Sequence, residues 1–273
     1  VNTRSIDGGC INSAYQLQGE LTSYFVKLNR RELLPMFESE FAGLEEMSQN
    51  GVLRVPQPIV CGILGDQSYL VLEMIALKPG NNYSDRRLGE QLAKLHQAVK
   101  PFFGWRRDNT IGATVQINKS NNDWEVFWKE YRLRFQLSLA ENNGFAGRLI
   151  KSGEELCDSL GHFFDGYKPH PSLLHGDLWA GNAAVDDLGE PVVFDPACYY
   201  GDREADLAMT ELFGGFSSDF YAVYNENLPR DSGDSSRETL YNLYHILNHL
   251  NLFGGGYLGQ AQNMIDRLLS EAR

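Results

Sequence analysis

The sequence lacks the features that mark membrane proteins, secreted proteins and zinc-binding modules. No apolar run approaches the roughly 20 residues that a membrane-spanning helix needs, so we expect no membrane partner. Residues 1–4 show neither the charged start nor the apolar core of a signal peptide. The four cysteines are scattered and form no CxxC pair, which disfavours a zinc site or a disulfide framework. We therefore expect a cytoplasmic protein with reduced thiols.

Basic charge is also scarce. The 24 Lys and Arg residues face 36 Asp and Glu residues, which gives a formal net charge of −12. A nucleic-acid partner is disfavoured because phosphate backbones are recognised by basic surfaces. The 273 residues, 42% of them hydrophobic, suffice for one large domain or for two lobes with a shared cleft.

The first third of the chain alternates short extended segments with turns. A Gly19-Glu20 turn separates the first two segments and predicts a β-hairpin. Residues 35–50 place apolar side chains at helical spacing, and Gly51 lies just past the end, so this segment is predicted to be a long helix. The strands predicted in this part are 13–17, 23–28, 58–61 and 68–74.

The rest of the chain is mostly helical in pattern. The run Lys-Pro-Gly-Asn-Asn at 78–82 interrupts regular structure, so we expect an N-terminal lobe over 1–77 and a C-terminal lobe over 78–273. Short strands are predicted at 172–174 and 192–194. The predicted helices are 85–99, 123–142, 146–164, 203–213, 236–252 and 257–270. The pattern indicates an α+β protein with a small β-rich lobe, which contains one long helix, and a larger helical lobe.

The densest polar motif is Leu-His-Gly-Asp-Leu-Trp-Ala-Gly-Asn at 174–182, followed by Val-Val-Phe-Asp at 192–195. Asp177 and Asn182 have the five-residue separation of the Asp and Asn in a kinase catalytic loop. Asp195 ends a short hydrophobic strand, where a kinase places its second metal-binding carboxylate. Singly, such residues often cap turns. In this order and spacing they predict phosphoryl transfer from ATP with Mg²⁺ as the metal.

The motif resembles the fructosamine kinase, or ketosamine kinase, family within the aminoglycoside phosphotransferase-like kinases. The resemblance also rests on the stretch Phe-Asp-Pro-Ala-Cys-Tyr-Tyr-Gly-Asp-Arg-Glu at 194–204, and it covers roughly residues 5–270. It implies a bilobal protein-kinase-like fold. It also implies that a phosphoryl group is transferred from ATP to the C3 hydroxyl of a ketosamine. Ketosamines are sugar–amine adducts such as fructosamines and ribulosamines, so the implied role is the repair of glycated amines or lysines.

The resemblance assigns roles residue by residue. It implies that Asp177 is the catalytic carboxylate, that Asn182 and Asp195 bind the metal, and that Asp206 braces the catalytic loop. His175 is expected to be a scaffold residue. Lys27 is expected to reach the α- and β-phosphates, and a buried lysine needs an acidic partner. That partner is expected to be Glu40. Glu38 is the alternative, because the sequence does not fix the register of the helix that carries both residues.

Further contacts with ATP are expected in the predicted N-terminal lobe. Glycines let backbone N–H groups approach phosphates, so Gly8, Gly9 and Cys10 are predicted to contact the nucleotide. Glu73 and Met74 follow the last strand of this lobe and are predicted to form the hinge that meets adenine.

Trp179 and the aromatic segment 102–128 are candidates for the acceptor side. Trp179 lies two residues after Asp177, where it can stack on the acceptor or hold its cationic amine; the alternative is a tryptophan that anchors the loop. For the aromatic residues of 102–128 we expect packing beneath a long loop.

Two other functions stay open from the sequence. One is an aminoglycoside or choline-type kinase, and the other is a nucleotide-binding protein without turnover. A protein substrate is disfavoured because only eleven positions separate Asp195 from Asp206, too few for an activation segment. The sequence does not indicate an oligomeric state.

Overall fold

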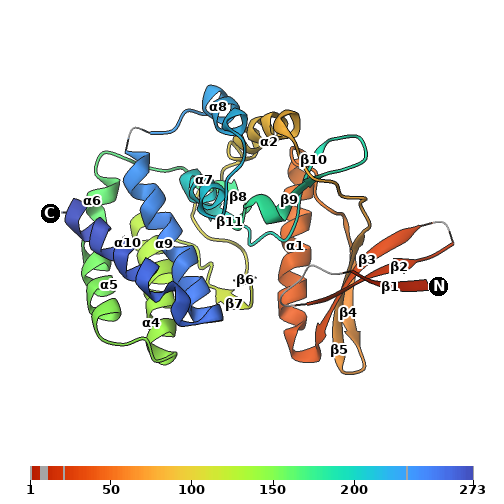
Figure 1. Ribbon diagram of the computed structural model, residues 1–273, viewed down its shortest axis with the longest axis horizontal. Helices are drawn as coiled ribbons and strands as arrows, with labels where there is room; N and C mark the ends of the chain where they lie inside the picture. Colours follow the sequence, from red (N-terminus) through yellow and green to blue (C-terminus); the bar gives the residue numbers. More distant parts are fainter. Residues whose placement is uncertain (1, 7–11, 21, 232, 273) are drawn as a thin grey trace. The chain divides into compact units, whose positions relative to one another are not determined.

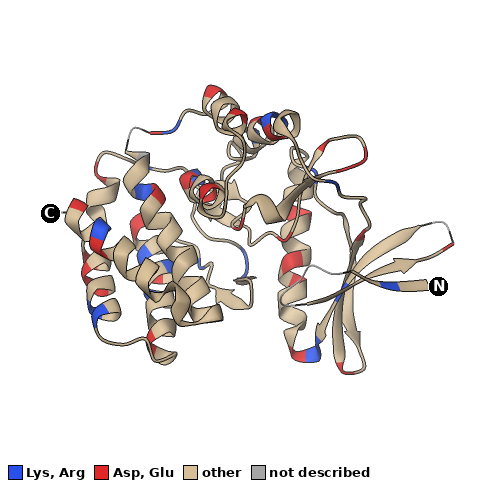
Figure 2. Ribbon diagram, viewed as in Figure 1, with Lys and Arg blue, Asp and Glu red and all other residues tan. Residues whose placement is uncertain are grey.

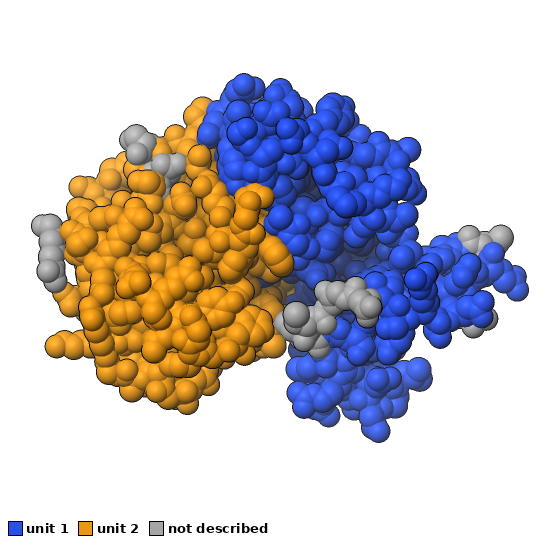
Figure 3. Space-filling model, in the orientation of Figure 1, with its two compact units in different colours: residues 1–95, 180–197, 216–227 blue, residues 96–179, 198–215, 228–273 orange. Residues whose placement is uncertain are grey.

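The computed structural model describes residues 2–6, 12–20, 22–231 and 233–272, which fold into two compact units (Figures 1 and 3). Unit 1 contains residues 1–95, 180–197 and 216–227, and unit 2 contains residues 96–179, 198–215 and 228–273. The chain therefore passes between the units several times. The expected division into lobes at residue 77 stays a prediction.

A five-stranded antiparallel sheet with the order β1-β2-β3-β5-β4 forms the base of unit 1. The predicted hairpin is present, since β2 and β3 pair in register from Ser13 opposite Leu28 to Gln18 opposite Ser23. The strands of the sheet are β1 Asn2–Ile6, β2 Ser13–Gln18, β3 Ser23–Arg30, β4 Pro58–Leu64 and β5 Gln67–Glu73.

The long predicted helix, α1 (Leu34–Asn50), packs on β4 and β5. Pro35 in its first turn suits a helix start, because proline has no N–H to offer and its φ is already helical. Gly51 ends the helix with φ at 71°, a left-handed conformation that glycine adopts without strain. Phe37, Leu44 and Met47 are fully buried on its inner face, so they tie the helix to the sheet.

A helix pair and a short hairpin complete unit 1. Helix α2 (Asn82–Leu95) packs closely on α8 (Ser218–Asn227), a helix that the sequence reading missed. A Cβ at Gly89 would lie 2.4 Å from the backbone oxygen of Phe220, so only glycine allows this approach. The hairpin is formed by β9 (Ala183–Val185) and β10 (Pro191–Val193).

Unit 2 is mainly helical, as its sequence pattern predicted, with two small antiparallel strand pairs. These pairs are β6 (Asn109–Ile111) with β7 (Thr114–Gln116), and β8 (Ser172–Leu174) with β11 (Tyr199–Gly201). Its α-helices are α3 Trp124–Trp128, α4 Arg134–Asn142, α5 Arg148–Asp158, α6 Gly161–Phe164, α7 Arg203–Leu212, α9 Asp234–Phe253 and α10 Leu258–Glu271.

Two predicted helices of this unit are not continuous. The predicted helix 123–142 contains a π-helical turn, Lys129–Leu133, between α3 and α4. Arg132 in this turn is fully buried and donates to the backbone oxygen of Ile117 at 2.6 Å. The π-helical turn therefore carries an arginine that is hydrogen-bonded to a neighbouring segment. The predicted helix 146–164 is broken between α5 and α6, where Ser159 caps the end of α5.

The aromatic residues of the segment 102–128 pack in the core of unit 2. Trp128 is fully buried, and Phe103, Trp105 and Trp124 are at most 5% exposed. Trp124 contacts the ring of Phe103 at 5.0 Å between centroids. This confirms the expectation of packing. Among the residues that the structure describes, no helix is both long and apolar enough to cross a membrane.

Candidate functional site

A buried lysine in unit 1 bridges two acidic side chains from distant parts of the sequence. Lys27 lies on β3 and is 7% exposed. Its Nζ donates to Oε1 of Glu40 on α1 at 2.7 Å and to Oδ1 of Asp195 at 2.6 Å. The expected pair of Lys27 with Glu40 is therefore present. The contact with Asp195 was not foreseen.

The two acidic side chains keep the ammonium group of Lys27 ionised. Burial lowers the pKa of Lys27, but the carboxylates of Asp195 and Glu40 outweigh burial, so the pKa of Lys27 lies above its usual value. Burial raises the pKa of Glu40, and the carboxylate of Asp195 raises it further. The ammonium of Lys27 lowers this pKa, but the net direction is upward. Removing one member would leave an uncompensated buried charge, which is costly. The cluster thus fixes one ammonium group beside the accessible carboxylate of Asp195.

Asp195 has an unusual backbone conformation. Its φ is 57°, and among the described residues it is the one non-glycine residue with a positive φ. Asp tolerates this conformation better than most residues, and such conformations concentrate at functional sites. Its side chain is 48% exposed although one oxygen meets Lys27. The conformation therefore holds a half-exposed carboxylate at a fixed place.

The β9–β10 hairpin brings Asn182 and Asp195 to the same end. Ala183 pairs with Val193, so the residues just before β9 and just after β10 are neighbours. The N–H of Phe194 donates to the backbone oxygen of Asn182 at 3.1 Å. Asn182 itself is buried at 7% exposure, in a 3₁₀ turn that spans Ala180–Asn182. A single hairpin thus brings together the two residues whose side-chain oxygens are predicted to bind the metal.

The donor types at this end of the hairpin fit Mg²⁺. Within the described part of the chain, no group of three or more His, Cys, Asp or Glu side chains forms a metal site. Mg²⁺ prefers oxygen ligands and commonly uses one or two carboxylates together with phosphates and water. A site formed by Asp195, Asn182 and nucleotide oxygens meets this requirement without a larger protein cage.

In unit 2, Asp206 on α7 holds the backbone of the loop that follows β8. Its Oδ2 accepts the N–H of His175 at 2.7 Å, and its Oδ1 accepts the N–H of Gly176 at 2.7 Å. Gly176 has a φ of 83°, which favours glycine. The N–H of Asp177 then donates to Nδ1 of His175 at 3.3 Å. Asp206 and His175 therefore fix the backbone around Asp177, in agreement with the supporting roles expected for them.

Asp206 stays charged although it is 1% exposed. Burial raises its pKa, but hydrogen bonds from His96 and from the Gly176 N–H outweigh burial, so the pKa of Asp206 lies below its usual value. Nε2 of His96 lies 3.2 Å from Oδ2 of Asp206. Burial lowers the pKa of His96, so at neutral pH the ring is a neutral donor to the carboxylate.

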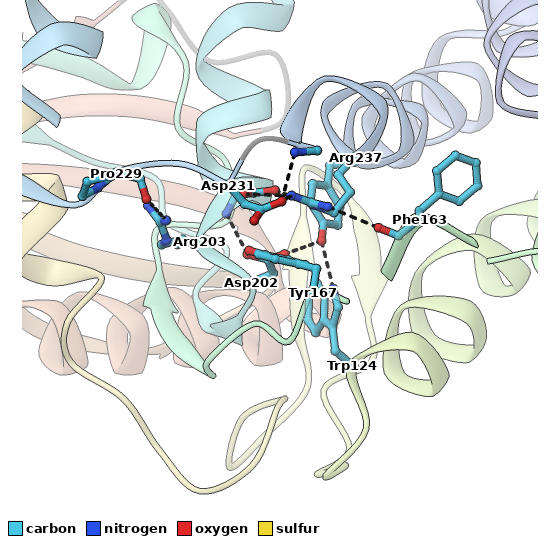
Figure 4. Close-up of polar contacts among 11 residues, drawn as sticks. Trp124, Phe163, Tyr167, Asp202, Arg203, Pro229, Asp231 and Arg237 are labelled. Atoms are coloured by element: carbon cyan, nitrogen blue, oxygen red, sulfur yellow. Dashed lines mark hydrogen bonds and ion pairs between the residues drawn. The ribbon is translucent and has the colours of Figure 1, made fainter. Parts of the chain in front are cut away.

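A second buried network anchors the start of α7 (Figure 4). Asp202 caps the helix by accepting the N–H of Glu204 at 3.0 Å, and it also accepts the hydroxyls of Tyr167 at 3.0 Å and Tyr241 at 2.5 Å. Nε of Arg237 donates to Glu204 at 2.7 Å. Burial, together with the nearby charge of Glu204, raises the pKa of Asp202 to about 6. The network fixes the helix that carries Asp206.

The remaining predicted site residues divide between the two units. Trp179 belongs to unit 2, is half-buried and contacts Phe213 edge to face at 6.0 Å between centroids. In unit 1, the carboxylate of Glu73 pairs with Arg54 at 2.5 Å, and this pairing lowers the pKa of Glu73. Met74 follows β5 in a segment without regular secondary structure. Gly8, Gly9 and Cys10 lie outside the described residues.

Several supporting residues were not predicted from the sequence. His96 has no local signal, because it lies 110 positions from Asp206. The cap at Asp202 could have been found, since Asp directly before a helical pattern is a common N-cap. The pair of Arg237 with Glu204 again joins distant segments and has no signature in the sequence.

Comparison with known proteins places this arrangement in a kinase-like fold. A solved structure from Haemophilus somnus 129PT that carries a fructosamine-3-kinase name has a TM-score of 0.91 at 29% identity, covering 98% of this chain and 91% of that chain. A choline kinase from Streptococcus pneumoniae has a TM-score of 0.68 at 15% identity, covering 100% of this chain and 93% of that chain. At this identity the match shows the fold alone. The chain thus has the α+β fold of the protein-kinase-like small-molecule kinases.

Sequence relatives identify the family within that fold class. The family model described as fructosamine kinase matches residues 1–271. A protein of Synechocystis sp. named as a probable ketoamine kinase is 49% identical over 267 residues, covering 97% of this chain and 90% of the relative. A chloroplastic protein-ribulosamine 3-kinase of Arabidopsis thaliana is 43% identical over 268 residues, covering 97% of this chain and 82% of the relative. The chain belongs to the fructosamine kinase family.

Proposed function

We propose that this protein transfers the γ-phosphoryl group of ATP to a hydroxyl of a ketosamine. The observation that carries the proposal is the match to the fructosamine kinase family across residues 1–271. Relatives named as a ketoamine kinase and a protein-ribulosamine 3-kinase support this acceptor class, and the second name supports the C3 hydroxyl. An aminoglycoside or choline-type acceptor is not favoured, because the similarity to such kinases extends only to the fold.

In this proposal the unit 1 residues bind the nucleotide. Lys27 contacts the α- and β-phosphates, and Glu40 holds the ammonium group in place by the 2.7 Å pair. Asn182 and Asp195 would hold Mg²⁺, which supplies neutralisation of the negative charge on the phosphate oxygens. Gly8, Gly9 and Cys10 are proposed phosphate-loop contacts, and the backbone at Glu73 and Met74 is the proposed adenine contact.

The proposed catalytic residue is Asp177. Its carboxylate accepts a hydrogen bond from the acceptor hydroxyl and orients the oxygen for in-line attack on the γ-phosphorus. The hydrogen bonds from His175 and Gly176 to Asp206 support this role, because they restrict the backbone that carries Asp177. Trp179 is the proposed contact for the acceptor's cationic amine, through its aromatic face.

The role in the cell follows from the same chemistry. Phosphorylation of a ketosamine would serve the repair of glycated amines. We retain the proposal of a cytoplasmic protein without a nucleic-acid partner. The excess of acidic over basic residues, drawn red and blue in Figure 2, gives the net charge of −12 that supports the absence of a nucleic-acid partner. Scattered cysteines without a CxxC pair support the location.

A substrate panel tests the proposal. Purified protein with Mg²⁺ and ATP would be given a ribulosamine, a fructosamine, choline and kanamycin, and ADP release would be followed. We expect ADP release that depends on a ketosamine and exceeds the rate with choline or kanamycin by at least a hundredfold. Equal rates with all acceptors, or faster turnover of choline or kanamycin, would contradict the proposal.

A further inference from the structure

The β9–β10 hairpin is hydrogen-bonded along both of its edges to other segments of unit 1. Beside β10, the N–H of Val193 donates to the backbone oxygen of Arg54 at 3.0 Å, and Arg54 forms a parallel bridge with Val192. Beside β9, the N–H groups of Lys78 and Val185 each donate to the backbone oxygen of the other residue at 2.9 Å. The hairpin is therefore the centre of a small sheet.

Both flanking segments lead to the end of β5. Lys78 follows in the same segment of chain, a few residues after Glu73, the last residue of β5. Arg54 reaches Glu73 with its side chain, because Nη1 donates to Oε2 at 2.8 Å and Nη2 donates to Oε1 at 2.5 Å. Two parallel bonds of this kind fix the direction as well as the distance between a guanidinium and a carboxylate. Arg54 thus bonds to β10 through its backbone and to β5 through its side chain.

The segment that carries Arg54 is stiff. Prolines at positions 56 and 58 restrict Val55 and Gln57 to extended conformations. The N–H of Gln57 donates to Oε2 of Glu73 at 3.2 Å, and its backbone oxygen accepts the N–H of Glu73 at 2.8 Å. Val55 is 1% exposed, so the segment is also anchored in the core of unit 1. A displacement of Glu73 is therefore passed on to Arg54 and to the edge of β10.

The two ends of this connection meet different parts of the proposed nucleotide site. Asp195, a proposed metal ligand, comes two residues after Val193 at the end of β10. Glu73 is followed directly by Met74, and the backbone of this pair is the proposed adenine contact. Arg54 thus joins the part of unit 1 proposed to bind the base to the part proposed to bind the metal and the phosphates.

A second ion pair of similar exposure offers a comparison. The side chains of Arg54 and Glu73 are 35% and 32% exposed. Arg87 on α2 pairs with Glu190 at 2.7 Å, and these side chains are 38% and 34% exposed. Pairs of this exposure contribute little to stability in general. The pair of Arg87 joins α2 to the residue before β10, at the end of the strand opposite to Asp195.

We propose that Arg54 is a positioning residue that couples the binding of adenine to the binding of Mg²⁺ and the phosphates. This inference rests on the proposed function. A base bound at Met74 fixes Glu73, the paired bonds from Glu73 fix Arg54, and Arg54 fixes the strand that ends before Asp195. A ligand that carries both base and metal therefore gains affinity that neither part provides alone. The backbone bonds of Glu73 and Val193 do not use the guanidinium, so each end keeps its own structure when the side chain of Arg54 is replaced.

Three probes separate this coupling from a general loss of structure. Mg²⁺-ATP carries both base and metal, Mg²⁺-tripolyphosphate lacks the base, and ATP in EDTA lacks the metal. Calorimetric titration gives the Kd of each probe for the parent protein, for Arg54→Met and Glu73→Gln, and for the control Arg87→Met. Thermal unfolding without ligand checks that each variant is folded. Excess loss is defined as the fold increase in Kd for Mg²⁺-ATP divided by the larger of the fold increases for the other two probes.

We expect Arg54→Met to raise the Kd of Mg²⁺-ATP about tenfold and the Kd of each other probe less than threefold. A tenfold change corresponds to about 1.4 kcal/mol. It lies within the range of about 5-fold to 150-fold that is usual for coupling between two sites. Glu73→Gln keeps the shape of the side chain but loses one of the two charged bonds, and it should show an excess loss of at least threefold. Arg87→Met should leave all three Kd values within twofold of the parent.

Two results would overturn the inference, and they differ in what they say about the enzyme. If the parent binds Mg²⁺-ATP but Arg54→Met shows an excess loss below threefold, including the case in which all three probes weaken alike, Arg54 is merely structural and the proposed function stands. Should Arg54→Met not fold, Glu73→Gln decides by the same limit. If the parent does not bind Mg²⁺-ATP, the proposed function fails and the inference fails with it.

Discussion

Replacing Asp206 by alanine should destabilise unit 2 and impair catalysis for one structural reason. The carboxylate is 1% exposed and accepts the N–H groups of His175 and Gly176, each at 2.7 Å. Without it, two buried N–H groups and the Nε2–H of His96 lose their acceptor. An unpaired buried donor costs about 1–3 kcal/mol, so we expect a loss of about 3–5 kcal/mol in the free energy of unfolding.

The conservative variant Asp206→Asn separates charge from shape. Its one carbonyl oxygen can take the place of Oδ2 and serve His175 and His96, but its NH₂ group then faces the N–H of Gly176. We expect about half the loss seen with alanine. The matched control is Asp158→Ala, since Asp158 is 69% exposed and pairs with Lys129 at the surface; a loss of at most about 1 kcal/mol is expected there.

The assays are denaturant unfolding and steady-state kinetics at a temperature where each variant is folded. For Asp206→Ala we expect Tm to fall by roughly 10 °C. We expect kcat to fall with KM for ATP nearly unchanged, because the bonds of Asp206 hold the loop of Asp177 in unit 2 and the proposed nucleotide contacts lie in unit 1. A loss below about 1 kcal/mol would refute the reasoning, as would an unchanged kcat in the folded variant.

Three further predictions concern ionisable side chains. Asp177→Asn should reduce kcat at least a hundredfold, while the Kd of Mg²⁺-ATP measured by calorimetry stays within threefold; turnover within tenfold of the parent would contradict the role of Asp177. Lys27→Met should raise that Kd at least tenfold and, by leaving Glu40 buried without its cation, cost about 3–5 kcal/mol of stability; an unchanged Kd would contradict the nucleotide contact. Burial lowers the pKa of His245 to about 3, so the unfolded chain binds more protons than the folded one between about pH 3 and 6.5, and stability from this group rises with pH across that window. The destabilisation caused by His245→Asn should therefore shrink on acidification from pH 6 to 4, by up to about 1.4 kcal/mol per pH unit, and a constant difference would contradict a neutral buried ring.

Local patterns predicted those parts of the fold that local physics determines. The helical spacing of Phe37, Leu44 and Met47 marked α1, and the turn before β3 marked the first hairpin. The strands β9 and β10 are three residues each. The apolar run Val192-Val193-Phe194 predicted β10, whereas β9 was missed because Ala183 and Ala184 have low strand propensity. Helix α8 was missed although Phe220, Val223 and Tyr224 form a short buried face at helical spacing.

The candidate site was predictable by residue type but not by contact. Asp177, Asn182 and Asp195 were selected by order and spacing, and the pair of Lys27 with Glu40 was expected from burial and family spacing. The contact of Lys27 with Asp195 joins residues 168 positions apart and depends on how the β9–β10 hairpin packs in unit 1. The left-handed conformation of Asp195 likewise follows from the tertiary fold, because Asp at a strand end usually has a negative φ.

The claim that this protein is a ketosamine kinase is tested most directly by phosphorus NMR of the product formed from ATP, Mg²⁺ and a defined ribulosamine. The account predicts a new phosphomonoester signal, coupled to the proton on C3 of the sugar, that grows in proportion to ADP. Signals of ADP and inorganic phosphate alone, or a phosphomonoester at another carbon as the main product, would contradict it.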